Sequence, residues 1–161
     1  MSGLAYVFPG QGSQSVGMLV AKSSEVAATY EEASEALGYD MGELISSGPE
    51  EVLNQTEYTQ PALLTVSVAL FRYAMNNNAE FPDVVLGHSL GEYAALVAAE
   101  AIRFEDAVKS YSNIPSIGGR KQLKILPDTP TIDPFYNFSN QPTICKCVIA
   151  LRRTWFSVWT L

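Results

Sequence analysis

The chain has 161 residues, of which 47% are hydrophobic and 17% charged, and its formal net charge is -7. This composition is typical of one globular domain and excludes disordered and fibrous proteins. The acidic charge argues against nucleic acid as a partner, and no apolar run approaches the roughly 18 residues that a membrane span needs, so we expect a cytoplasmic protein.

The first predicted element is a strand. Residues 4–8 form a short apolar run without alternation, ended by Pro9 and Gly10, and this pattern is typical of a strand buried on both faces of a parallel sheet. The loop over residues 10–14 reads GQGSQ. It lacks the Lys-Ser/Thr pair of a P-loop and the third glycine of a dinucleotide fingerprint, so we do not expect it to bind phosphate.

Two amphipathic helices are predicted next. From Ser24, apolar residues recur at helical spacing as far as Leu37, and Gly38 suits the C-terminal cap. The chain breaks at residues 48–49 (Gly-Pro). A second helix is predicted to begin with Pro61 in its first turn and to end near the asparagines at residues 76–78.

Residues 87–91 read Gly-His-Ser-Leu-Gly, between the apolar run 84–86 and an alanine-rich helix predicted over residues 94–101. A strand, a tight turn and a helix in this order predict a nucleophile elbow that exposes the hydroxyl of Ser89. The alternative is a glycine-rich turn with an incidental serine, and the strand and helix on either side favour the catalytic interpretation. The predicted reaction class is acyl transfer.

The first loop is expected to meet this elbow. If strands 4–8 and 84–86 lie side by side and parallel, both loops leave the same edge of the sheet, which brings the backbone amide of Gln11 toward Ser89. The start of the helix after Ser89 supplies further backbone N–H groups. Two independent donors would then face one oxyanion.

His88 is the only histidine of the chain. A general base must approach the serine oxygen from across the pocket, whereas neighbouring residues of an elbow point in different directions, so we predict a shaping role for His88. Glu92, in the first turn of the helix, is expected to interact with the helix dipole. The sequence therefore supplies no general base.

Composition changes near residue 110. Residues 104–108 begin another helix with acids in its first turn, but no helical or strand period follows. Residues 1–109 contain 15 acidic and 4 basic residues (net -11), whereas residues 110–161 contain 2 acidic and 6 basic ones (net +4). We predict a domain portion over 1–109 and an unrelated or out-of-frame, irregular tail over 110–161. Its final stretch, 143–161, is predicted to be either a strand or a poorly folded end.

The two cysteines, Cys145 and Cys147, are too close for an ordinary disulfide and lack further metal ligands. Free thiols and no metal site are predicted.

Three segments in this order, residues 8–14 (FPGQGSQ), 59–64 (TQPALL) and 87–93 (GHSLGEY), closely resemble the malonyl-CoA:acyl carrier protein transacylases of bacterial fatty-acid synthesis. The resemblance covers residues 1 to about 109. It implies an α/β fold with a parallel-sheet, α/β-hydrolase-like subdomain that is incomplete here, and a ferredoxin-like small subdomain that is missing.

The resemblance also implies an activity and a set of site residues. Malonyl would pass from malonyl-CoA to the acyl carrier protein through an acyl-enzyme on Ser89, with the coenzyme A thioester as substrate and no cofactor. Gln11 and Leu90 would supply the amides of the oxyanion hole, and Gln60 and His88 would shape the pocket.

Two expected family residues are absent. The helix after residue 104 should carry an arginine for the malonyl carboxylate, but residues 111–115 read Tyr-Ser-Asn-Ile-Pro, and no histidine follows Ser89. The sequence therefore predicts an incomplete acyltransferase that is poorly active or inactive. Two alternatives are a serine esterase or thioesterase, which also needs a later histidine, and a non-catalytic fragment that binds the carrier protein.

Overall fold

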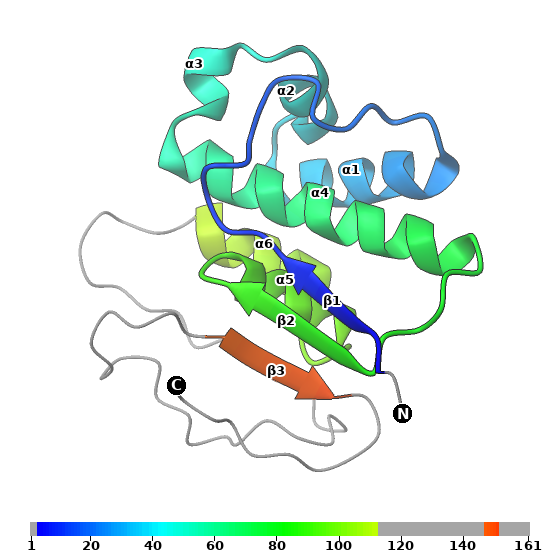
Figure 1. Ribbon diagram of the computed structural model, residues 1–161. Coiled ribbons are helices and arrows are strands. Elements are labelled where there is room, and N and C mark those ends of the chain that lie inside the picture. Colours follow the sequence, from blue (N-terminus) through cyan, green and yellow to red (C-terminus); the bar gives the residue numbers. More distant parts are fainter. Residues whose placement is uncertain (1–2, 113–146, 152–161) are drawn as a thin grey trace, which may run out of the picture.

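The computed structural model describes residues 3–112 and 147–151. Within them, strands β1 (Ala5–Phe8), β2 (Val84–His88) and β3 (Cys147–Leu151) form a sheet in the order β1-β2-β3 (Figure 1). β1 and β2 are parallel, with Ala5 opposite Val84 and Phe8 opposite Gly87, and β3 is antiparallel to β2. The predicted parallel pairing of the first two strands is confirmed.

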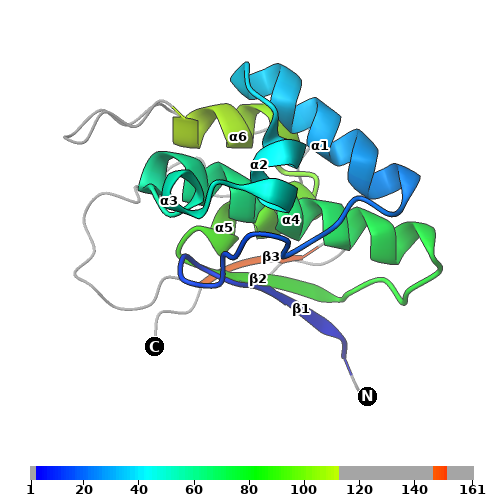
Figure 2. The same cartoon turned by 90° about the horizontal axis from the view of Figure 1, so that it is seen from above.

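The described helices lie on one side of this sheet, as Figure 2 shows. They are α1 (Ser24–Leu37), α2 (Met41–Ser47), α3 (Glu50–Leu53), α4 (Thr56–Asn76), α5 (Gly91–Ala98) and α6 (Phe104–Ser112). Phe8 points into the core that they form, whereas Val7 is 68% exposed. The prediction that residues 4–8 are buried on both faces is therefore wrong for the described structure, because no described helix covers the second face.

Helix α1 has the bounds and caps that the sequence indicates. The side chain of Ser23 accepts a hydrogen bond from the backbone N–H of Val26, and Gly38, at φ 80°, donates its N–H to the carbonyl of Ser34. A left-handed residue of this kind is usually glycine, because a β-carbon disfavours that conformation. The cap therefore ends the helix where predicted.

Helix α4 begins five residues before Pro61, so the predicted start of this helix is wrong. The turn that precedes the proline is held by Thr59, whose hydroxyl donates to the carbonyls of Leu53 (2.5 Å) and Gln55 (3.0 Å). Because these bonds stabilise the first turn from within the fold, Pro61 lies inside the helix rather than at its beginning.

Helices α2 and α3 were not expected from the sequence. The side chain of Asp40 caps α2 by accepting from the backbone N–H of Glu43 at 2.8 Å, and α3 is a single turn that follows Pro49. Short helices of this kind depend on packing more than on periodicity.

The helix that follows the elbow also has other bounds than the sequence predicts. Helix α5 covers residues 91–98 rather than 94–101, and the chain turns at Glu100, which has φ 59°. The predicted helix that opens at residue 104 is confirmed as α6.

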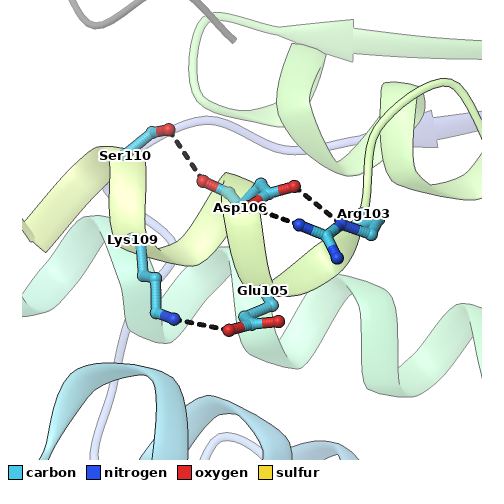
Figure 3. A network of polar contacts seen from close by, with 5 residues as sticks. All are labelled: Arg103, Glu105, Asp106, Lys109 and Ser110. Carbon is cyan, nitrogen blue, oxygen red and sulfur yellow. Dashed lines mark hydrogen bonds and ion pairs between the residues drawn. The ribbon is translucent and has the colours of Figure 1, made fainter. Parts of the chain in front are cut away.

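Helix α6 is amphipathic, and local polar contacts link the side chains on its exposed face (Figure 3). Arg103 binds both carboxylate oxygens of Asp106 at 2.8 and 3.1 Å, Lys109 pairs with Glu105 at 2.5 Å, and Ser110 donates to the carbonyl of Asp106. Exposed pairs of this kind contribute only a few tenths of a kcal/mol each, roughly. Burial of the opposite face therefore stabilises α6 more than these pairs do.

The core lies between the inner face of the sheet and the helices, with α4 at its centre. Residues 61–69 of α4 are all buried. In the part of the chain that the structure describes, no helix is long and apolar enough to cross a bilayer.

The predictions for residues 113–146 and 152–161, including most of the irregular tail and the thiol of Cys145, lie outside the described residues. β3 falls within the stretch 143–161, for which a strand was one of two alternatives. The interpretation of residues 110–161 as an unrelated tail stays a prediction.

Candidate active site

Ser89 lies in the turn between β2 and α5, with the left-handed backbone angle φ 55°. This conformation costs a residue other than glycine roughly 1–2 kcal/mol. The turn is closed by the backbone N–H of Glu92, which donates to the carbonyl of Ser89 at 3.0 Å. The residue is exposed, so the strained turn presents its side chain at the carboxyl end of the sheet.

The two glycines of the elbow are required by contact with the backbone. A β-carbon on Gly87 would lie 2.1 Å from the carbonyl carbon and oxygen of Gly91, and one on Gly91 would lie 2.3 Å from the carbonyl oxygen of Phe8. No side chain fits at either position. The elbow geometry that the sequence predicts is therefore present, and the end of β1 packs directly against it.

The loop after β1 meets the elbow as expected. A β-carbon on Gly10 would lie 2.9 Å from Nδ1 of His88 and 3.6 Å from the β-carbon of Ser89. The next residue, Gln11, is therefore beside the nucleophile turn. Its side-chain oxygen also accepts a 3.5 Å hydrogen bond from the amide of Gln60 in α4. The five predicted site residues thus meet at one end of the sheet, since Leu90 directly follows Ser89 in the elbow.

Two residues that the sequence did not single out fix the shape of this loop. The side-chain oxygen of Gln14 accepts from the backbone N–H of Gly12 at 2.9 Å, and its amide donates to the side chain of Asn54 at 3.1 Å. Gln14 therefore ties the loop to the segment between α3 and α4. The only signal in the sequence was that Gln14 is part of the motif at residues 8–14.

The predicted oxyanion donors are available. In the described parts of the chain, neither the backbone N–H of Gln11 nor that of Leu90 donates a hydrogen bond. Leu90 stands immediately before the first turn of α5, and its own side chain is buried. Two free N–H groups on segments that meet at Ser89 form an arrangement that can stabilise a developing negative charge on oxygen.

His88 is exposed and lies at the end of β2, on the side of Gly10. The imidazole lies close to the first loop, and the shaping role of His88 stays a prediction. The rest of the sequence contains no other histidine that could act as the base. Among the described residues, no group of His, Cys, Asp and Glu could hold a metal ion.

Glu92 is more deeply buried than its predicted role at a helix end requires, with 8% of its surface exposed. It lies near two tyrosines of α5 and α6, Tyr93 and Tyr111, whose rings meet edge to face with their centroids 4.6 Å apart. Burial raises the pKa of both phenols, and the nearby carboxylate of Glu92 raises it further. The first turn of α5 is therefore fixed by the core as well as by the helix dipole.

A hollow of about 710 Å³ lies elsewhere, between α1, α4 and the end of α5. Glu25, Arg72 and Glu100 stand among its lining residues, and none of the residues of the two site loops does. The chemistry of Ser89 is therefore separate from this hollow.

Comparison with known proteins agrees with this geometry. The acyl transferase domain family matches residues 5–114, which is more than half of the chain. The chain belongs to this acyltransferase family. The malonyl CoA-acyl carrier protein transacylase of Salmonella typhimurium is 54% identical over 112 residues, which cover 68% of this chain and 36% of the relative.

Two further comparisons show the extent of the likeness. The Haemophilus influenzae enzyme of the same name is 42% identical over 152 residues, which cover 91% of this chain and 47% of the relative. A solved structure of a malonyl-transacylase in complex with its type II PKS acyl-carrier protein has a TM-score of 0.66, with 48% identity over 69% of this chain and 37% of that one. The chain thus spans about one third to one half of the length of these acyltransferases.

Proposed function

We propose that this chain carries the nucleophile-bearing part of a malonyl-CoA:acyl carrier protein transacylase of fatty-acid synthesis, and that malonyl passes through an ester on Ser89. The observation that carries the proposal is the strained turn at Ser89, enclosed by two glycines that contact backbone. A serine held at positive φ lowers the stability of the fold. Because the same turn places an exposed hydroxyl beside two free backbone N–H groups, a catalytic role explains why this strain is kept. The names of the matched relatives indicate malonyl-CoA as the donor of the malonyl group and the acyl carrier protein as its acceptor.

The proposed reaction has two balanced steps. The oxygen of Ser89 attacks the thioester carbonyl of malonyl-CoA, the carbon–sulfur bond breaks, and coenzyme A leaves as a thiol with the proton of the serine. The thiol of the carrier protein then attacks the serine ester and gives its proton back to Ser89 as the ester bond breaks. Both tetrahedral intermediates place an oxyanion between the amides of Gln11 and Leu90.

Gln60 and Gln11 line this proposed pocket with neutral amide groups. Their mutual 3.5 Å hydrogen bond ties α4 to the loop over residues 10–14. A fixed loop holds the amide of Gln11 in place before the oxyanion develops, which is the condition for electrostatic catalysis. Gln14 acts as a positioning residue for the same loop through its bonds to Gly12 and Asn54.

The proton transfers need a base that this sequence does not contain. Removal of the histidine from other serine enzymes lowers turnover on the order of a million-fold, which corresponds to about 8 kcal/mol of transition-state stabilisation. We therefore expect the chain by itself to show only trace transfer. In the proposal, the base belongs to the length of the relatives that this chain does not span.

A chimera tests the proposal. Residues 1–112 of this chain replace the matched 112 residues of the Salmonella relative, and transfer of labelled malonyl from malonyl-CoA to acyl carrier protein is measured. The expected result is rapid transfer that disappears in Ser89→Ala and persists in the control Ser46→Ala, whose exposed hydroxyl lies in α2. A folded chimera whose Ser89→Ala variant still transfers malonyl would overturn the proposal.

A further inference from the structure

The N–H of Gln11 is the proposed oxyanion donor that stands in a loop. Leu90, the other proposed donor, is the N-cap residue of α5 and is held by that helix. Gln11 belongs to the exposed turn after β1, where no helix or strand fixes the backbone. A backbone N–H stabilises an oxyanion only if it already points to the place where the charge develops. Side chains must therefore hold the two peptide units on either side of the α-carbon of Gln11.

The first of these peptide units joins Gly10 to Gln11 and carries the proposed donor. The hydroxyl of Ser13 donates a hydrogen bond of 3.3 Å to the carbonyl of Gly10. This carbonyl and the N–H of Gln11 lie in one plane and point in opposite directions, so a bond that holds the carbonyl also holds the direction of the N–H. The same bond polarises the peptide unit, which makes its N–H a stronger donor.

The second peptide unit joins Gln11 to Gly12, whose N–H donates to the side-chain oxygen of Gln14 at 2.9 Å. The amide group of Gln14 has an oxygen at one end and an NH₂ group at the other, and half a turn would exchange them. The side-chain oxygen of Asn54 accepts from this NH₂ group at 3.1 Å. Because that contact needs a donor on Gln14, it keeps the oxygen of Gln14 on the side of Gly12. Asn54 therefore sets the orientation of the amide.

The support behind Asn54 is the junction between α3 and α4. Asn54 is the C-cap residue of α3, and the carbonyl of the fully buried Leu53 before it accepts from the hydroxyl of Thr59. Thr59 is itself fully buried and directly precedes Gln60, whose amide binds the side chain of Gln11. One junction thus holds the loop at two points.

From these contacts we infer that Ser13 and Asn54 are positioning residues for acyl transfer. Ser13 acts on the peptide unit that carries the N–H of Gln11, and Asn54 acts on the next unit through Gln14. The inference deepens the proposed function and rests on it. Both side chains are exposed, so their removal leaves no cavity in the core and the fold should persist.

Kinetics of the chimera that contains residues 1–112 test the two roles. Complete removal of an oxyanion donor lowers kcat on the order of a hundredfold to a thousandfold, and a donor that is only less well directed should cost about tenfold. We therefore expect Ser13→Ala and Asn54→Ala each to lower kcat about tenfold. The KM for malonyl-CoA should stay within about twofold, because the lost interaction is made only in the transition state.

Conservative variants separate positioning from a general effect on the fold. Asn54→Asp keeps an oxygen that can accept from Gln14, and Ser13→Thr keeps a hydroxyl that can donate to the carbonyl of Gly10. Each should recover most of the kcat that the alanine variant loses. Urea unfolding of every variant checks that the fold is kept.

Two matched controls remove similar side chains elsewhere. Asn77 is an exposed C-cap residue of α4 whose amide donates to the carbonyl of Tyr73, and Ser46 is an exposed serine whose hydroxyl donates to the carbonyl of Gly42. Asn77→Ala and Ser46→Ala lose one hydrogen bond each, as the test variants do. Both should keep the kcat of the unchanged chimera.

NMR on the full 161-residue chain gives a second readout that needs no activity. Asn54→Ala should speed hydrogen exchange of the Gly12 N–H about threefold or more, because its acceptor is no longer held, whereas Asn54→Asp and Asn77→Ala should not. Ser13→Ala should shift the carbonyl ¹³C resonance of Gly10 upfield, since that carbonyl loses a hydrogen bond.

The outcomes distinguish this inference from the proposed function. An active chimera in which folded Ser13→Ala and Asn54→Ala keep the kcat of their controls would overturn the inference alone. Equal losses in Asn54→Ala and Asn54→Asp would also overturn the role of Asn54, because the accepting oxygen would then not matter. An inactive chimera, together with faster exchange of Gly12 in Asn54→Ala, would count against the proposed function and support the positioning of the loop. Unchanged exchange would contradict that positioning.

Discussion

Gly91 and Phe8 are in direct backbone contact: a β-carbon at residue 91 would lie 2.3 Å from the carbonyl oxygen of Phe8. The two residues are far apart in sequence, and the contact joins the end of the first strand to the start of the helix after Ser89. The loop over residues 10–14 leaves from this point. The contact therefore determines how closely the proposed oxyanion donors approach the nucleophile.

Gly91→Ala should disrupt the fold because the added methyl group overlaps backbone atoms, which cannot move aside as a flexible side chain can. We expect a loss of at least about 4 kcal/mol, a large part of the total stability of an ordinary domain. Urea unfolding measures this loss. The control is Gly3→Ala, whose β-carbon would make an ordinary 3.4 Å contact with Asp83, and it should unfold like the unchanged chain. Similar midpoints for the two variants would contradict the described contact.

Ser89→Gly and Ser89→Ala should differ in stability although both remove the nucleophile. Glycine adopts positive φ without steric strain, whereas alanine keeps the cost of roughly 1–2 kcal/mol, and the greater freedom of unfolded glycine offsets part of this difference. We therefore expect Ser89→Gly to be more stable than Ser89→Ala by up to about 1 kcal/mol in denaturant unfolding. A markedly less stable glycine variant would show that the turn is not strained.

Two buried tyrosine hydroxyl groups should respond in opposite ways to removal. The hydroxyl of Tyr30 donates to the carbonyl of Leu19 at 2.7 Å, whereas that of Tyr39 is buried with no hydrogen-bond partner among the described residues. Tyr30→Phe should therefore cost about 1 kcal/mol, and Tyr39→Phe should be neutral or stabilising. Thermal unfolding of the two variants measures the difference. Equal losses would contradict the assigned hydrogen bonding.

The same two tyrosines predict a loss of stability in alkali. Burial raises the pKa of each to about 12, whereas an unfolded tyrosine titrates near pH 10, approximately. A raised pKa in the folded state gives stability that is full below pH ~10 and is lost as the pH rises toward ~12. Urea midpoints measured across this range should fall, and they should fall less steeply in the double variant Tyr30→Phe, Tyr39→Phe. Parallel pH profiles would exclude these tyrosines as the cause.

The sequence predicted the parts of the fold that depend on local chemistry. Gly38 marks the end of α1 because only a left-handed residue can make that cap, and the glycines at residues 87 and 91 mark the elbow because backbone passes within contact distance. The parallel pairing of β1 and β2 followed from two apolar runs that each lead into a glycine-containing loop. Each of these signals depends on single residues, so it can be recognised without knowing which parts of the fold pack around them.

The predictions that failed depend on tertiary contacts. The start of α4 is set by the hydroxyl of Thr59, which reaches the carbonyl of Leu53 from the preceding helix. The cap of α2 was readable in Asp40 and Glu43, three residues apart, but the helix is too short to show a period. The exposure of Val7 depends on which surface covers the sheet, and a strand sequence alone cannot specify its cover.

The most direct test of the account is the position of the acyl group. The chimera that contains residues 1–112 is mixed with malonyl-CoA in the absence of carrier protein, quenched in acid, digested and mapped by mass spectrometry. The account predicts malonyl on the peptide that contains Ser89, and release of the group when carrier protein is added before the quench. Malonyl on a different residue, or transfer to the carrier protein with no malonyl on Ser89, would contradict it.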